Sequence, residues 1–158
     1  MAALFIELRL TGGQLMKLSH RAHRRLLLIY AASLALVALA LTIGVIDPVE
    51  VEASIGATRA IAVTAFWVIA GLNVLFAAIL VIIAARLKTQ TCDVTPVHAI
   101  GGIIVILLGI MLADAASAYQ SHGPSMQTAS SILVFCATAD VLTGVMMVIT
   151  AFLQPKKV

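Results

Sequence analysis

Asp140 is the one charged residue of a long apolar stretch, ILVFCATADVLTGVMMVITAF, which covers residues 132–152. A second carboxyl, Asp114, follows the apolar run AIGGIIVILLGIMLA (99–113), and an amide, Asn73, lies within VIAGLNVLFAAIL (68–80). Carboxyl groups that are kept from water bind protons or ions, or form hydrogen bonds with other buried polar groups. These three side chains are therefore the candidate chemical groups of the chain.

Asn73 and Asp140 are expected at the same depth in the membrane. Residue 140 is twelve positions after Thr128, and residue 73 is twelve after Ile61. Each interval corresponds to about 18 Å along a helix, and the two helices cross in the same direction. A charged carboxyl at mid-bilayer costs on the order of 2.5–3.5 kcal/mol, and the sequence places no basic residue at this depth. We therefore expect Asp140 to be neutral at pH 7 and to hydrogen-bond Asn73.

Two further residues complete a predicted intramembrane polar cluster of Asp140, Asn73, Asp114 and Thr143. Thr143 is three residues after Asp140, a spacing that places both on one helix face. Asp114 is expected roughly 8 Å below the membrane surface, because it lies five residues before Tyr119, where the expected span 99–119 ends. The long side chain of Arg59 is within reach of that position, which makes an interfacial ion pair between Arg59 and Asp114 the expected arrangement.

Small residues at regular spacing predict where helices approach one another closely. Gly109, Ala113 and Ser117 follow one another at intervals of four residues, and Gly144 lies four residues after Asp140. We expect these small residues to pack helices together on the faces that carry the polar groups. The opposite face of the last run suits lipid and carries Val134, Leu142, Val145 and Ile149.

The composition requires that these residues be positioned by membrane-spanning elements. Of 158 residues, 62% are hydrophobic and only 11% are charged, and the mean hydropathy is +1.12, whereas a soluble domain carries about a quarter charged residues. Four apolar runs are long enough to cross about 30 Å of hydrocarbon as helices. The predicted fold is all-α, an antiparallel four-helix transmembrane bundle. Its expected spans are 26–46, 61–85, 99–119 and 128–153, between a basic N-terminal segment (1–25) and a basic tail (154–158).

A cleaved signal peptide is the competing interpretation of the first run. Its basic residues lie far into the chain, however, and no small-x-small cleavage motif follows it, so a membrane span is favoured. The distribution of basic residues predicts that both termini are cytoplasmic, because one side of the membrane receives nine of the ten and the other keeps only Arg59. Those nine are Arg9, Lys17, Arg21, Arg24, Arg25, Arg86, Lys88, Lys156 and Lys157.

Other chemistry has few residues to support it. The four histidines lie outside the deep parts of the runs and have no further ligands nearby, so neither a metal site nor haem ligation is predicted. There is no Gly-rich phosphate loop and no nucleophile with a base at a recognisable spacing, so no catalytic residues and no cofactor are predicted. The basic stretch KLSHRAHRR adjoins the first run directly, which favours anionic lipid headgroups over nucleic acid as its partner. Cys136 is expected to be a packing residue, and Cys92 a loop thiol or a lipidation site.

Three classes of function are compatible with this pattern. A non-enzymatic protein that organises membrane domains, or serves as a small accessory subunit of a membrane complex, needs only the helix faces and a partner, either another copy or a larger complex. A proton- or ion-coupled component would use Asp140 and Asp114, since intramembrane carboxyls mark such paths. A membrane enzyme for small molecules would need a ligand beside Asp140. The first class is favoured, in a plasma or secretory-pathway membrane.

The plan of the chain resembles that of MARVEL-type four-span proteins, particularly the small fungal ones. The likeness lies in the basic lead HRAHRRLLLIY and in alanine-rich spans such as TRAIAVTAFWVIAGLNVLFAAIL and FCATADVLTGVMMVITAF. The second outer loop, QSHGPSMQ, departs from the family because it lacks the paired cysteines of some members. The resemblance implies a role in membrane domains or traffic without catalysis, and it carries over no functional residues.

Overall fold

The computed structural model describes residues 20–46, 57–87, 95–120 and 124–152. Within these ranges, the side chains of residues 20–21, 46, 57–63, 120 and 124–126 are not described. The described residues are helical except for Leu87, which lies in a turn. Its elements are α2 (His20–Leu41), the π-helical turn η1 (Thr42–Ile46), α4 (Ala57–Arg86), α5 (Thr95–Gln120) and α6 (Pro124–Phe152).

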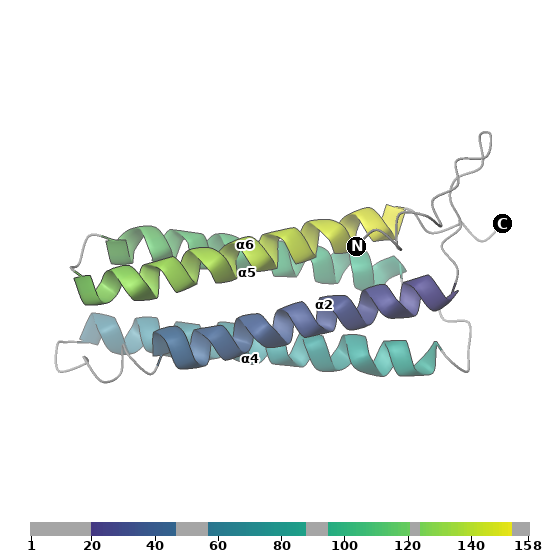
Figure 1. The fold of residues 1–158 in the computed structure, drawn as a ribbon, viewed down its shortest axis with the longest axis horizontal. Coiled ribbons are helices and arrows are strands. Elements are labelled where there is room, and N and C mark those ends of the chain that lie inside the picture. Colours follow the sequence, from purple (N-terminus) through teal and green to yellow (C-terminus); the bar gives the residue numbers. More distant parts are fainter. Residues whose placement is uncertain (1–19, 47–56, 88–94, 121–123, 153–158) are drawn as a thin grey trace.

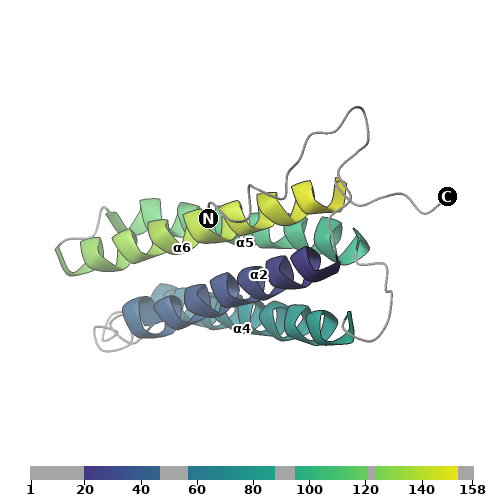
Figure 2. The same cartoon turned by 45° about the vertical axis from the view of Figure 1, so that its right-hand side comes forward.

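The four long helices form a bundle in which each runs antiparallel to the one before it (Figure 1). α2 lies along α4, and α5 lies along α6; the view turned by 45° shows the same pairing (Figure 2). α5 and α6 make the most extensive contact, whereas α4 and α5 scarcely touch. The bundle therefore consists of two helical hairpins that are held together mainly through α2 and α6.

All four helices are long and apolar enough to cross a membrane, so the protein is a multi-pass integral membrane protein. A helix lies at each of the four predicted runs, and each helix begins before its run; the first begins at His20, inside the segment that the sequence assigned to a non-spanning N-terminal region. Proline explains two of the helix starts, because Pro96 and Pro124 lie in first turns, where a missing N–H leaves no hydrogen bond unmade. The spans are Ala22–Val45, Thr64–Arg86, Thr95–Tyr119 and Gln127–Phe152.

The outer surface of the bundle is apolar, as lipid requires. The residues that the sequence assigned to the lipid face of the last span are all exposed, with Leu142 at 60% and Val134 at 45%. Exposed hydroxyls on this surface bond to the backbone of their own helix: Thr138 Oγ1 donates to the Val134 carbonyl at 2.8 Å, and Ser131 Oγ to that of Gln127 at 2.9 Å. Such bonds leave no donor unpaired toward the acyl chains.

Small residues spaced seven apart bring α5 and α6 into close contact. A Cβ on Gly102 would lie 2.7 Å from the Gly144 carbonyl oxygen, and a Cβ on Gly109 would lie 2.9 Å from that of Ala137. One further step along, Ser130 Oγ donates to the Ala116 carbonyl at 2.8 Å. The paired series are Gly102, Gly109 and Ala116 on α5, and Gly144, Ala137 and Ser130 on α6.

This series corrects the predicted packing face of α5. Gly109 and Gly144 lie in the α5–α6 contact, but Ala113 and Ser117 have exposed side chains. Residues spaced four apart rotate steadily around a helix, so a series that starts at Gly109 leaves the line of contact between two antiparallel helices after about one turn. The line of contact follows a seven-residue repeat instead, which is the geometry of left-handed helix pairs.

The buried core is divided into two apolar clusters along the bundle axis. One cluster takes Leu27, Tyr30, Ala31 and Leu34 from α2, and the other takes Val37, Ala38 and Leu41 from the same helix. On α4 the division falls between Ala70 and Ala77, and on α6 between Ala137 and Met147. Asn73 and Asp140 lie in these intervals, so the candidate polar groups occupy the layer that separates the clusters.

Candidate functional site: a polar layer inside the bundle

Asn73 on α4 and Asp140 on α6 meet at the centre of the bundle. The amide Nδ2 of Asn73 donates to Asp140 Oδ2 at 3.2 Å, and neither residue is exposed at all. α4 and α6 have little contact of their own, because the bundle places them diagonally. The hydrogen bond therefore joins the two hairpins through the interior.

The face of α6 around Asp140 is turned inward. Cys136, Ala137, Thr143 and Gly144, its neighbours at three and four residues, are all buried, as the sequence predicted. Ala70 and Ala77 flank Asn73 in the same way on α4. The small side chains leave space for the carboxyl and the amide to meet between helices that do not pack directly.

Each partner in this bond keeps one oxygen without a hydrogen-bond partner, Oδ1 in both Asn73 and Asp140. A carboxylate offers acceptors alone, whereas a neutral carboxylic acid also has a hydroxyl to donate. An acid and an amide are complementary on both sides, because the acid O–H donates to the amide oxygen while the amide N–H donates to the acid carbonyl. The pair is thus chemically suited to a proton on Asp140.

Thr143 belongs to a separate bond. Its Oγ1 lies 2.8 Å from Ser33 Oγ on α2, so this hydroxyl is paired with α2 and not with Asp140, which lies one turn away on the same face of α6. Ser33 is half-buried and was not among the predicted residues. This hydroxyl pair joins α2 to α6 at the edge of the polar layer.

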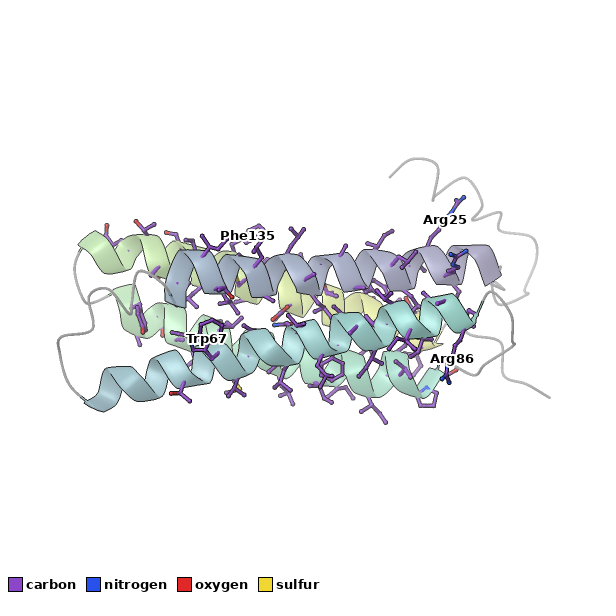
Figure 3. The ribbon with its side chains drawn as sticks, turned by 90° about the horizontal axis from the view of Figure 1, so that it is seen from below. Arg25, Trp67, Arg86 and Phe135 are labelled. Atoms are coloured by element: carbon purple, nitrogen blue, oxygen red, sulfur yellow. The ribbon has the colours of Figure 1, made fainter. Side chains whose placement is uncertain are left out.

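More polar groups occupy the core between this layer and one end of the bundle, where Figure 3 shows Arg25 on α2 and Arg86 on α4. Arg24 adjoins Arg25 in the chain, and this end is here called the basic end. Tyr30 Oη lies 2.8 Å from Thr150 Oγ1, which in turn donates to the Met146 carbonyl at 2.7 Å. The ring of His98 lies 6.2 Å from that of Tyr30, measured between centroids.

Two histidines meet close to the basic end. The rings of His23 on α2 and His98 on α5 are 5.1 Å apart and packed edge to face. His98 is completely buried, and His23 is 8% exposed. The sequence placed both histidines outside the deep parts of the runs and gave them no role. Their burial follows from the antiparallel arrangement, which brings the starts of α2 and α5 together at the same end.

The other predicted site residues are not part of this interior set. The Asp114 side chain is exposed, so it does not join Asp140 in one cluster. The Arg59 side chain lies outside the described residues, as do residues 1–19, Cys92 and the tail, so the predicted ion pair stays a prediction. Cys136 is a buried free thiol whose Sγ lies 3.9 Å from the Val37 carbonyl oxygen, which fits a packing role. No group of three metal-ligating side chains occurs among the described residues.

The interior arrangement can hold the two hairpins together and can bind a proton. Its polar groups are of the kind that form hydrogen bonds between helices.

No protein-family model, no curated protein and no solved structure matched the chain.

Proposed function

We propose that this protein acts through contacts of its transmembrane helices, as an organiser of membrane domains or as a small accessory subunit of a membrane complex. Its deepest polar groups are turned toward one another, as in the bond between Asn73 and Asp140. The surface that they leave to the surroundings is apolar and offers helix faces to lipid and to other helices. A second copy or a larger complex is the expected partner.

The outer face of α4 carries the proposal. Thr64, Gly71, Ala78 and Ala85 follow one another at seven-residue spacing, and all four are exposed. A Cβ built on Gly71 would meet nothing within 4 Å. Larger side chains alternate with the small ones, since Val68, Leu75 and Ile82 are 55–56% exposed.

α5 and α6 use the same seven-residue pattern of small residues where they pack against each other inside the bundle. In lipid, where helices gain little from burying apolar surface, small residues promote association because they let backbones approach. The outer face of α4 therefore has the composition of a packed helix face and has no helix upon it in the single chain.

Gly71→Leu tests this proposal. We expect the variant to fold like the natural chain, because the site is open, and to lose at least about 1 kcal/mol of helix association, a several-fold weaker complex. The measurement is the mass of the complex purified in mild detergent, together with the proteins that co-purify in stoichiometric amounts. Ala32→Leu, at an exposed small residue of α2, is the matched control and is expected to change neither. If Gly71→Leu and Ala32→Leu give complexes of the same mass with the same co-purifying proteins, the proposed role of the α4 face is refuted.

The same proposal includes an orientation. Arg24, Arg25 and Arg86 lie together at the basic end, and cytoplasmic loops are the ones enriched in Arg and Lys. We place this end in the cytoplasm of a plasma or secretory-pathway membrane, where it contacts anionic headgroups. The resemblance to MARVEL-type proteins implies the same arrangement.

An ion path through both carboxyls has less support. Asp140 is buried between two apolar clusters, while the Asp114 side chain is exposed on another helix, so the two do not line one route. This separation favours a role in helix contacts over an ion path.

A further inference from the structure

We propose that Asp140 is a proton-binding site in exchange with the aqueous phase at the basic end of the bundle and closed to the opposite phase. The ligand is the proton, delivered by water from one side. This site is separate from the outer face of α4 proposed above for helix contacts, and its test does not depend on that proposal.

Polar groups continue from Asp140 toward the basic end at intervals of one to two helical turns. Thr143, paired with Ser33 at 2.8 Å, lies three residues further along α6, about 4.5 Å by helix rise. The Tyr30–Thr150 pair follows at 2.8 Å, and Tyr30 is itself three residues from Ser33 on α2. The rings of His98 and His23 come next, at centroid distances of 6.2 Å from Tyr30 and 5.1 Å from each other.

On the side of Asp140 away from the basic end, the core has a different composition. It consists of the apolar cluster that includes Leu41, Phe66, Leu112 and Leu133, of which Phe66 is 3% exposed and the others are not exposed at all. The buried hydroxyl described in this half, that of Ser130, donates to the Ala116 carbonyl at 2.8 Å and, unlike that of Thr150, has no second hydroxyl as a partner. Water entering from this end would have to cross several packed apolar layers that offer it few polar groups.

The proposed step is a simple ionisation. The Asp140 O–H bond breaks, the electron pair stays on the carboxylate, and the proton passes to water that enters between the hydroxyl pairs from the basic end. Hydroxyls can relay a proton because each is both donor and acceptor. The titratable groups among the described residues around this route are Tyr30 on α2, His98 on α5 and Cys136 on α6; α4 contributes the neutral amide of Asn73. His23, Arg24, Arg25 and Arg86 stand at the mouth of the route.

One-sided pH steps on oriented proteoliposomes test the proposal. The readout is the infrared carbonyl band of the protonated carboxylic acid, assigned to Asp140 by its absence in Asp140→Asn. The lumen is buffered while the outer pH is stepped across about 5 to about 10, a range that lies above the ordinary pKa of a free Asp carboxyl. We expect the band to respond when the basic end faces the stepped phase, and to stay constant in vesicles of the opposite orientation.

Substitutions along the proposed route distinguish proton relay by its hydroxyls from water entry that does not depend on them. Thr143→Val and, as a second probe, Ser33→Ala are expected to slow the response at least about tenfold, as loss of a positioned proton-transferring group does. Ser130→Ala, which removes a buried hydroxyl from the apolar half, is the matched control and should leave the rate within about twofold. Circular dichroism confirms that each variant retains its helices.

Four results would overturn the proposal. One is a band that follows the pH of the phase opposite the basic end, and another is a band that responds to neither phase. The third is an equal rate in the Thr143, Ser33 and Ser130 variants. A steady proton flux across the vesicle wall that disappears in Asp140→Asn would also contradict it, since such a flux requires access from both sides.

Discussion

Replacing Gly144 with leucine is expected to lower the free energy of unfolding by at least about 3 kcal/mol, at the upper end of the usual cost of overpacking. A Cβ at this position would already lie 2.6 Å from the Gly102 carbonyl oxygen and 2.9 Å from the Ile106 nitrogen. Both are backbone atoms, so no side-chain rotation can relieve the clash, and α5 and α6 must separate. Equilibrium unfolding in detergent, followed by circular dichroism, measures the loss.

The chain supplies a matched control for this substitution. Gly71→Leu introduces the same side chain into another transmembrane helix, at a site where a Cβ meets nothing within 4 Å. Its unfolding free energy is expected to stay within about 0.5 kcal/mol of the natural chain, as for other surface substitutions. If both glycine variants are equally destabilised, the added leucine side chain itself accounts for the effect, and the close contact of α5 and α6 does not.

Asp140→Leu is expected to destabilise the bundle by about 1–2 kcal/mol, while Asp140→Asn is tolerated within about 0.5 kcal/mol. Leucine leaves the Asn73 amide buried with no partner, because that amide donates to Asp140 Oδ2 in the natural chain. Asparagine can both accept from Asn73 and donate to it, and it also imitates the neutral acid in charge. The measurement is the same unfolding transition, together with the yield of assembled protein.

A double substitution separates the hydrogen bond from the volume of the side chain. Asn73→Leu combined with Asp140→Leu removes both polar groups, which costs less than leaving one of them unpaired. The double variant is therefore expected to be less destabilised than the sum of the two single leucine variants. Leucine at position 140 that assembles as well as asparagine would show that the Asn73–Asp140 bond does not stabilise the bundle.

The large features of this fold could be predicted because the membrane restricts the alternatives. Apolar runs of sufficient length must be helices, and counting residues from Ile61 and Thr128 was enough to place Asn73 and Asp140 at one depth. The two residues are now joined by a 3.2 Å hydrogen bond. Depth in the membrane is fixed by helix rise alone, which is why this part of the site was accessible from the sequence.

Rotation of the helices about their axes was harder to predict. Four-residue and seven-residue spacing both begin on the face of Gly109, so sequence alone did not separate the exposed Ala113 and Ser117 from the buried Ala116. The Ser33–Thr143 and His23–His98 contacts depend on which helices are neighbours, a property that four similar apolar runs do not specify. Gly101, Gly102 and Val105 follow His98 at three, four and seven residues and are buried, so this helical spacing is the signal that could have suggested the burial of His98.

The separation of Asn73 and Asp140 by 67 residues along the chain also has a consequence for biogenesis. At ordinary ribosomal speeds the carboxyl is synthesised roughly 3–13 s after the amide. The Asn73 amide is therefore synthesised well before its partner, and a buried amide without a partner is destabilising by about 1–3 kcal/mol. The last span supplies that partner, so the polar layer is completed only when α6 has been made.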